Sequence, residues 1–280
     1  QSVGLGASLR ILRKPQKRRS GGLPEACQLA DCSSQRLQRR RSAAMIGSSV
    51  MVLRADQVRV VSLDAGGTLL FPHPSVGEVY SEILSRHGIE LRPDEIEVRF
   101  RRVFSNLRGI PRNRVDDAAE WAFWERLVRE VLSPECPPDR FADVFIELFG
   151  AFAEGRRWRV AEGGEDLVRR LRGRGIRVVL LSNSDSRLRR VLREKGLIDL
   201  FDEVFISAEI GFEKPDIRLF RTVEERLQER KEALLHVGDS VYHDLEGARN
   251  AGWQALHLAG EFRPSEDKIA RLTDLRLLLG

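Results

Sequence analysis

Four side chains in this sequence could together do chemistry on an anion: Asp64, Ser182, Lys214 and Asp239. Two carboxylates at one site repel each other unless a cation lies between them, and hard oxygen ligands suit Mg²⁺. A serine hydroxyl can donate a hydrogen bond to a phosphoryl oxygen. A lysine can neutralise the same group and keep Asp64 ionised and nucleophilic. Taken singly, Lys214 is more simply a solvated surface lysine and Ser182 a helix cap, but the set together favours a magnesium site at which Asp64 attacks a bound anion such as a phosphate.

The strand that leads into Asp64 is the best-defined element of the sequence. Residues 58–63 are mostly apolar and β-branched, which is typical of a strand buried on both faces. Asp64 ends this strand and is followed by Gly66 and Gly67, whose backbone amides could surround a phosphate. Alone, such an Asp would be expected to begin an ordinary turn.

From Gly163 onward, strand and helix patterns alternate, which predicts a parallel sheet with right-handed crossovers and helices on both faces. Ligands of such sheets bind beyond the carboxyl ends of the strands. We therefore expect Asp64, Ser182 with Asn183, and Asp239 to meet at one edge. The expected strands are 176–181, 204–206, 233–237 and 254–258, and the expected helices are 166–174, 185–195, 216–230 and 244–250.

Between the first strand and this alternating region, apolar residues recur at helical spacing in four stretches. The aromatic residues in these stripes are interpreted as the core of a helical bundle and not as a ligand box. The fold class is therefore α/β, a Rossmann-like doubly wound parallel sheet with an inserted helical-bundle cap. The expected domains are a basic extension (1–54), an α/β core (55–73 and 161–280) and a cap (74–160).

Composition places the positive charge of the chain in its first residues. The formal charge is +5, yet residues 1–54 alone carry eleven Lys/Arg against two acids, which leaves the rest at −4. The predicted folded part thus offers no general basic surface for nucleic acid. No apolar run reaches the length of a membrane helix, so no membrane partner is expected. The cysteines Cys27, Cys32 and Cys136 are not at metal-ligand spacing, and a reduced, cytoplasmic setting is expected.

The first 54 residues are rich in Arg, Ser and Gly and lack a hydrophobic period, so we expect them to be disordered. The chain begins with Gln, and Met45 and Met51 precede the first strand. One interpretation is that the natural protein begins at one of these methionines. A second is that the segment is an organelle transit peptide. A third is a basic arm that binds nucleic acid, although no aromatic residue is interleaved with its arginines.

Four motifs occur in order along the chain: DAGGT (64–68), LLSNS (180–184), EKPD (213–216) and GDSVYHD (238–244). With them the sequence resembles the haloacid dehalogenase-like hydrolase superfamily, in its subfamily with an all-helical cap inserted after the first motif. The resemblance implies that Asp64 is the nucleophile, that Lys214 and Ser182 bind phosphate, and that Asp239 is a magnesium ligand. It further implies a metal contact from the Gly66 backbone carbonyl, support from Asp244, and phosphate contacts from Asn183, Gly67 and Thr68.

The sequence departs from the phosphatases of this superfamily at Gly66, where they have a second Asp as general acid and base. Such catalysis contributes about 10² to 10⁴ in rate. Three alternatives stay open: a phosphohydrolase with a substitute acid or a weakly basic leaving group, a metal-independent 2-haloacid dehalogenase, and a binding protein with impaired catalysis. Candidate substitute acids are His243, Asp185, Asp117 and Glu120, although Asp185 is more simply a helix N-cap.

Overall fold

The computed structural model describes residues 53–108, 112, 114–260 and 267–279. The predicted extension, 1–54, lies outside these residues except for Leu53 and Arg54. The backbone amide of Arg54 donates to the side-chain oxygen of Gln254 at 2.7 Å, and Leu53 packs on the core. Within the described ranges, no helix has the length and apolar character needed to cross a membrane.

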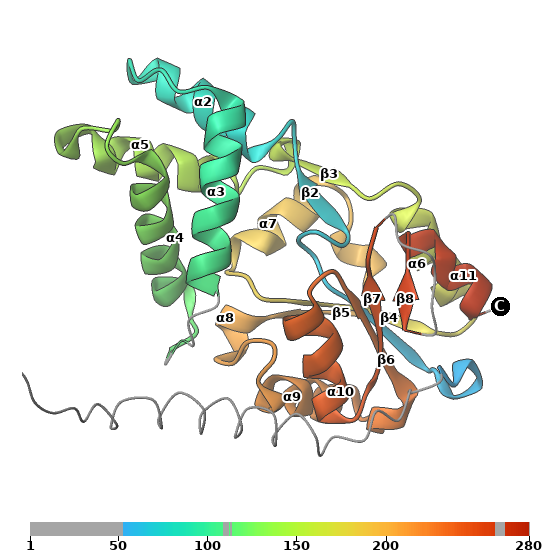
Figure 1. Ribbon diagram of the computed structural model, residues 1–280. Helices are drawn as coiled ribbons and strands as arrows, with labels where there is room; N and C mark the ends of the chain where they lie inside the picture. The colour runs from blue at the N-terminus through green and yellow to red at the C-terminus, as the bar shows by residue number, and fades with distance from the viewer. Residues whose placement is uncertain (1–52, 109–111, 113, 261–266, 280) are drawn as a thin grey trace, which may run out of the picture. The chain divides into compact units, whose positions relative to one another are not determined.

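A six-stranded parallel sheet lies at the centre of the core, in the order β5-β4-β1-β6-β7-β8 (Figure 1). This arrangement confirms the predicted doubly wound α/β class. Strand β1 lies between β4 and β6, and all four of its residues are buried, as expected for a strand covered on both faces. The strands are β1 (Val60–Leu63), β4 (Arg177–Ser182), β5 (Glu203–Ile206), β6 (Leu234–Gly238), β7 (Gln254–Leu258) and β8 (Lys268–Ile269).

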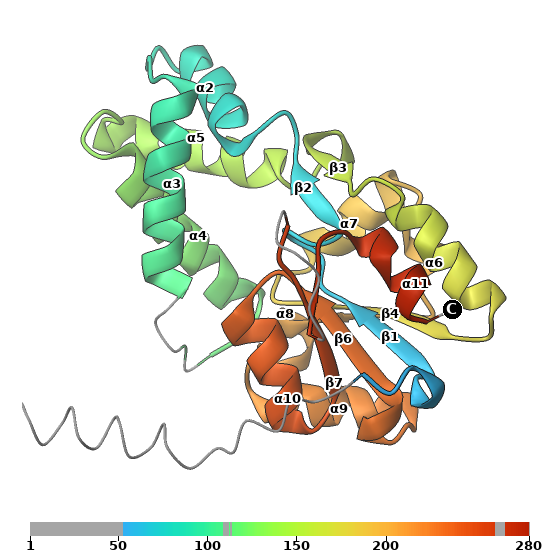
Figure 2. The ribbon, with the colours of Figure 1, turned by 45° about the vertical axis from the view of Figure 1, so that its right-hand side comes forward.

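Alternate residues of the strands belong to two separate hydrophobic clusters, one on each face of the sheet. Val61 and Val178 pack in a cluster with helices α6 and α7, whereas Val60 and Val179 pack in a cluster with α9 and α10. Figure 2 shows these helices on opposite sides of the sheet. The helices of the core are α6 (Gly164–Gly173), α7 (Arg187–Glu194), α8 (Ser207–Ile210), α9 (Ile217–Leu227), α10 (Gly247–Ala251) and α11 (Leu275–Leu278).

Four helices inserted after β1 form a hydrophobic cluster of their own, and we call them the cap: α2 (Val76–Arg86), α3 (Pro93–Arg108), α4 (Asp117–Leu132) and α5 (Pro138–Ala151). The predicted aliphatic stripes, including Ile83, Leu127 and Val144, are buried inside the cap. The side chains of Ser75 and Asp116 accept hydrogen bonds from backbone amides at the starts of α2 and α4.

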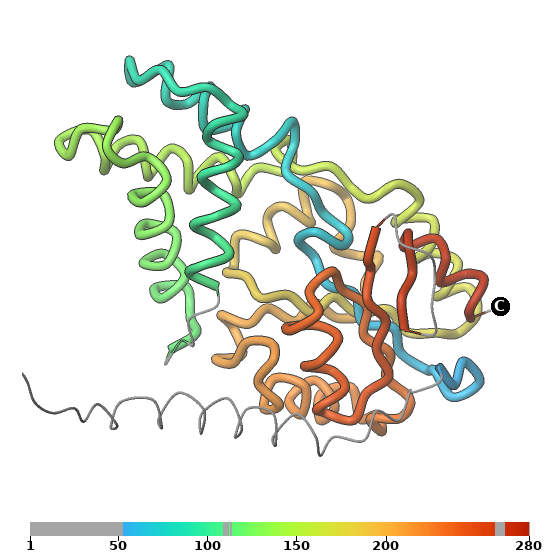
Figure 3. Tube along the Cα trace, viewed as in Figure 1, coloured from blue at the N-terminus to red at the C-terminus, as the bar shows by residue number. Residues whose placement is uncertain are grey.

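The chain enters and leaves the cap through a two-stranded antiparallel ribbon (Figure 3). It pairs β2 (Leu70–Pro72) with β3 (Trp158–Val160). Part of the segment 74–160 is therefore strand, although only helical patterns are expected there. Three residues are too few for strand periodicity to be recognised, and their pairing partners lie almost ninety positions apart.

The other elements that differ from the expected ones are short. The segment expected as helix 244–250 is a π-helical turn, η5 (Val241–Glu246), followed by α10. The core also contains β8 and α11, which have two and four residues and were not expected. Elements this short depend on tertiary contacts and have no periodicity of their own.

Two glycines in cap helices allow a matched test of the packing between α2 and α3. A Cβ on Gly77 in α2 would overlap the backbone carbonyl of Pro93, whereas a Cβ on Gly150 in α5 would meet nothing within 4 Å. We expect Gly77→Ala to lower the free energy of unfolding by about 1 to 3 kcal/mol through overpacking. Gly150→Ala should raise it by about 0.5 to 1 kcal/mol through helix propensity. Urea unfolding of both variants measures the difference, and equal effects would contradict the close approach of α2 and α3.

Candidate active site

Three neighbouring strands end in the polar side chains that the sequence predicts for one sheet edge. Leu63 is in register with Leu180 of β4 and with Val237 of β6. Asp64, Ser182 and Asp239 follow at or just beyond the carboxyl ends of these three strands, and all three line one cavity. The structure therefore brings these predicted residues together.

Lys214 reaches the same edge from the loop between α8 and α9, and its side chain is almost fully buried. Its Nζ lies 2.7 Å from Asp64 Oδ1, 2.6 Å from Asp244 Oδ1 and 2.9 Å from the backbone oxygen of Leu181. An ammonium group has three N–H donors, and each finds an acceptor here. The interpretation of Lys214 as a solvated surface lysine is thereby excluded.

Asp244 is held by several donors besides Lys214. His236 Nε2 donates to Asp244 Oδ1 at 3.0 Å, and the backbone amide of Ser240 donates to Oδ2 at 2.9 Å. The other ring nitrogen of His236, Nδ1, accepts from the hydroxyl of Ser62 at 2.9 Å. Both carboxylate oxygens of Asp244 are thus engaged within the protein, which makes it a group that orients its neighbours.

His236 and Ser62 are not among the predicted site residues, since both lie inside apolar strands and are fully buried. They are register partners in adjacent strands, because Ser62 of β1 is paired with His236 of β6. A polar residue at the middle of each of two buried strands is a signal that could have identified them, since buried polar groups need hydrogen-bond partners.

The three carboxylates at this edge fit a divalent cation. One oxygen from each of Asp64, Asp239 and Asp244 lies within 4.8 Å of the others. The approach of Asp239 depends on Gly67, because a Cβ at that position would lie 2.5 Å from Asp239 Oδ2, and its φ of +82° favours glycine. Oxygen ligands, with one exposed carboxylate beside a cavity, are a donor set that could hold a metal ion.

Burial and charge shift the ionisation of these groups in different directions. Burial, opposed by Lys214 and supported by Asp244, raises the pKa of Asp64 to about 6. Burial also disfavours the charged form of Asp244, but Lys214 and the hydrogen bond from His236 outweigh it and lower its pKa. Burial and the nearby Asp244 raise the pKa of Asp239. Asp244 is therefore the constant partner of Lys214, whereas Asp64 and Asp239 carry charge that a bound cation would stabilise.

The residues expected to bind phosphate occupy different environments. Ser182 is buried at the wall of the cavity. Gly67 also lines the cavity, but its backbone amide donates to the oxygen of Leu70 at 3.0 Å. The side chain of Asn183 instead pairs with the backbone of Lys214, donating to its oxygen and accepting from its amide, both at 2.8 Å. Thr68 is fully buried, and its hydroxyl lies 3.4 Å from Asp239 Oδ1. Asn183 thus positions the Lys214 loop, and phosphate contacts from Asn183 and Thr68 stay predictions.

Gly66 lies exposed on the cavity wall, and a Cβ there would meet nothing within 4 Å. Among the four candidate substitute acids, His243 and Asp185 line the cavity. His243 Nδ1 donates to the backbone oxygen of Lys214, and Asp185 is paired with Arg187 and accepts from its backbone amide. Asp117 accepts from the Ser186 amide, and Glu120 is buried in ion pairs with Arg112 and Arg108.

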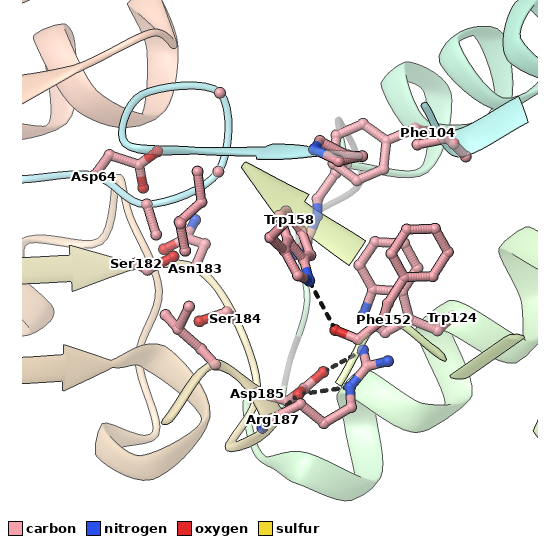
Figure 4. Close-up of a pocket in the computed structure, with 18 of the residues that line it drawn as sticks. Asp64, Phe104, Trp124, Phe152, Trp158, Ser182, Asn183, Ser184, Asp185 and Arg187 are labelled. Carbon is pink, nitrogen blue, oxygen red and sulfur yellow. Dashed lines mark hydrogen bonds and ion pairs between the residues drawn. The ribbon is translucent and has the colours of Figure 1, made fainter. Parts of the chain in front are cut away.

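The cavity has a volume of about 800 Å³ and extends from Asp64 to the cap (Figure 4). The interpretation of the aromatic stripes as bundle core is confirmed for Phe145, which is buried in the hydrophobic cluster of the cap. It is incomplete for stripe residues such as Phe104 and Phe149, which pack against this cluster and also line the cavity. Helical periodicity identifies an apolar face, but it does not say whether that face meets another helix or a cavity. The aromatic residues that line the cavity are Tyr80, Phe100, Phe104, Trp124, Phe145, Phe149, Phe152 and Trp158.

The similarity of this chain to known proteins covers more than the four motifs around the site. Residues 58–252 match the family of haloacid dehalogenase-like hydrolases. Haloacid dehalogenase-like hydrolase domain-containing protein 3 of Mus musculus is 30% identical over 73% of this chain and 83% of its own length. Phosphoserine phosphatase of Thermus thermophilus is 35% identical over 56% of this chain and 65% of its own length. The structure of YfnB from Bacillus subtilis bound to magnesium has a TM-score of 0.63 at 19% identity, covering 79% of this chain and 99% of that chain.

The raised pKa of Asp64 predicts how stability depends on pH in metal-free protein. Its ordinary pKa is 3.8, and its pKa in the folded protein is about 6. The stability associated with neutral Asp64 is therefore fully present below pH 3.8 and is lost as the pH rises through 6. The difference between these two pKa values corresponds to a free energy on the order of 3 kcal/mol. We expect Asp64→Asn, which mimics the neutral form, to be more stable than the wild type at pH 7.5 by about 2 to 3 kcal/mol, and equally stable near pH 4.

Urea unfolding in the presence of a chelator at the two pH values measures this difference. Asp143→Asn, at an exposed position of α5, is the control and should change stability by less than about 0.5 kcal/mol at both. A variant at Asp64 that is no more stable than the wild type at pH 7.5 would contradict the burial penalty.

Proposed function

Because the chain belongs to the haloacid dehalogenase-like hydrolase family, we propose that it is a magnesium-dependent phosphohydrolase that forms an aspartyl-phosphate at Asp64. The observation that carries this proposal is the position of Asp64. It lies at the end of β1, 2.7 Å from Lys214 Nζ, with oxygens of Asp239 and Asp244 within 4.8 Å. We propose that its substrates are small phosphorylated metabolites. We also propose that it acts in the cytoplasm and does not bind nucleic acid or membranes.

Each residue of the site has a different role in the proposed reaction. A carboxylate oxygen of Asp64 attacks the phosphorus atom, and the bond to the leaving group breaks with its electron pair on the leaving oxygen. The positive charge of Lys214 offsets the negative charge of the phosphoryl oxygens, and the hydroxyl of Ser182 donates a hydrogen bond to them. Water then attacks the phosphorus of the aspartyl-phosphate, releases phosphate and restores Asp64.

Asp64, Asp239 and the backbone carbonyl of Gly66 would hold Mg²⁺, and Asp244 would support the site through its neighbours. When bound, the ion supplies positive charge for the phosphoryl oxygens and lets Asp64 and Asp239 stay ionised side by side. The relative named as a phosphoserine phosphatase and the magnesium-bound neighbour of similar fold support this assignment.

Gly66 restricts which leaving groups the site can expel. A carboxylic acid at this position would protonate the leaving oxygen, and its loss raises the barrier by roughly 3 to 5.5 kcal/mol. An aryl or acyl phosphate avoids this cost, since its leaving group is stable as an anion. We therefore propose that the preferred substrates carry a weakly basic leaving group.

Gly66 also favours a second candidate, a metal-independent 2-haloacid dehalogenase, because a halide leaves without a proton. The three clustered carboxylates weigh against it, since Lys214 supplies only one positive charge to them and a reaction without metal supplies no second one. A binding protein with impaired catalysis would keep the fold and show neither activity.

The proposal is tested with purified protein assayed on an aryl phosphate, an alkyl phosphate and 2-chloropropionate. We expect magnesium-dependent turnover of the first, little of the second and none of the third. EDTA and Asp64→Asn should each abolish phosphatase activity, whereas Asp143→Asn should retain it. Dehalogenation in EDTA would replace the proposal with the second candidate, and the absence of every activity would favour a binding protein.

The role of Gly66 predicts a gain of activity on substitution. The open space beside this residue accommodates a side chain. We expect Gly66→Asp to raise kcat/KM for the alkyl phosphate at least about tenfold, with a smaller effect on the aryl phosphate. Gly66→Asn has a similar shape but no acidic proton and is the matched control, for which no gain is expected. Equal gains in both variants would show that proton transfer is not what limits turnover.

A further inference from the structure

We propose, on the basis of the function proposed above, that the cap side of the cavity is a binding site for an aromatic ring system, so that the substrate is an aromatic phosphate. The cavity has two chemically different ends. Asp64, Ser182, Lys214 and Asp239 lie at one end, and rings from α3, α4, α5 and β3 lie at the other. Figure 4 shows Asp64 facing this group of rings across the cavity.

The rings form a continuous apolar wall. Phe100 and Phe104 are stacked with centroids 5.6 Å apart and planes within 14° of each other, and Phe104 continues the stack to Trp124 at 6.1 Å. The indole N–H of Trp158 donates to the backbone oxygen of Phe152 at 3.0 Å. The polar atom of this indole is thus already satisfied, and the rest of its ring is apolar surface that suits the face or edge of another ring.

The two arginines near this wall are paired with carboxylates of the protein. Arg187 donates to Asp185 at 2.7 and 2.9 Å and to the backbone oxygen of Phe149 at 2.8 Å, with its guanidinium 3.4 Å from the centroid of the Phe149 ring. Arg108 lies 4.3 Å from the centroid of the Phe123 ring and near Glu120 and Glu213, at 3.5 and 3.6 Å, although its buried Nη1 has no hydrogen-bond partner. Their charges are therefore balanced before any ligand enters.

This environment disfavours the leaving groups of sugar phosphates and phosphorylated amino acids. Their hydroxyl or ammonium groups would lose hydrogen bonds to water against a wall of aromatic rings. An aromatic leaving group loses no such bonds and stacks on the wall instead. It also needs no proton when it departs as a phenolate or aromatic carboxylate, which agrees with Gly66. A volume of about 800 Å³ has room for a bicyclic ring system.

The test separates ring binding from leaving-group basicity. Acetyl phosphate, cyclohexanecarbonyl phosphate and 2-naphthoyl phosphate all release a carboxylate, so their leaving groups depart without a proton. We expect kcat/KM for 2-naphthoyl phosphate to exceed that for acetyl phosphate by at least about tenfold, mainly through KM. Cyclohexanecarbonyl phosphate should lie between them. Equal values for all three, or a preference for the cyclohexane ring, would overturn the aromatic site.

Two Phe→Leu substitutions test whether the preference for an aromatic substrate arises from the rings that line the cavity. Phe104→Leu removes a ring from the wall and should reduce the ratio of naphthoyl to acetyl turnover at least about fivefold, and Phe149→Leu should act in the same direction. Phe141→Leu removes a buried cap ring that does not line the cavity, and the ratio should not change. Circular dichroism confirms that each variant is folded, and a ratio unchanged by both cavity variants would overturn the proposal.

A binding measurement distinguishes failure of this inference from failure of the proposed function. 1-Naphthylphosphonate and methylphosphonate cannot be hydrolysed at their carbon–phosphorus bonds, so calorimetry with Mg²⁺ reports their affinity without turnover. Tighter binding of the naphthyl compound by at least about fivefold, lost in Phe104→Leu, supports the aromatic site even if no phosphate is hydrolysed. Equal affinities, together with turnover of acetyl phosphate, would overturn the site and leave the phosphohydrolase in place.

Discussion

The ammonium group of Lys214, buried between two carboxylates at the edge of the sheet, is the interaction on which the rest of the site depends. A charge removed from water is tolerated only where acceptors surround it, and here they come from Asp64, Asp244 and the backbone of Leu181. These acceptors belong to the end of β1, the turn after β6 and the strand β4. The lysine therefore ties three parts of the core to one point, and it sets the charge of the group that we propose as the nucleophile.

Close packing around this ion pair explains several residues that have no direct contact with a substrate. Gly67 leaves the space that Asp239 occupies, and a side chain at Gly238 would overlap Asp244. Asn183 holds the backbone of Lys214, while His236 connects Asp244 to Ser62 across two adjacent strands. Each of these contacts limits the freedom of a charged side chain, and preorganised charges cost no rearrangement when the substrate reacts.

The cavity combines this charged edge with an apolar cap, and the two halves favour the same kind of substrate for different reasons. Gly66 removes an acid from the edge, which favours a leaving group that is stable as an anion. The stacked rings of Phe100, Phe104 and Trp124 favour a leaving group without hydrogen-bonding needs. The cap lies in sequence between β1 and β4, so one insertion brings the aromatic wall to the carboxyl ends of the strands.

The sequence by itself determined the α/β class, the strands that end at Asp64, Ser182 and Asp239, and the choice of Lys214 as their partner. Strand periodicity and the rule that parallel strands share a carboxyl edge are enough for the class and the three strand ends, whereas Lys214 was chosen from the EKPD motif and its order among the other motifs. Only the tertiary structure decided that the aromatic stripes of the cap partly line a cavity, that Asn183 faces the backbone of Lys214, and that β2 pairs with β3. It also revealed Ser62 and His236 as partners, although each looks like a core residue in its own strand. The physical reason is that local patterns specify which face of an element is apolar, whereas the group opposite that face comes from a distant part of the chain.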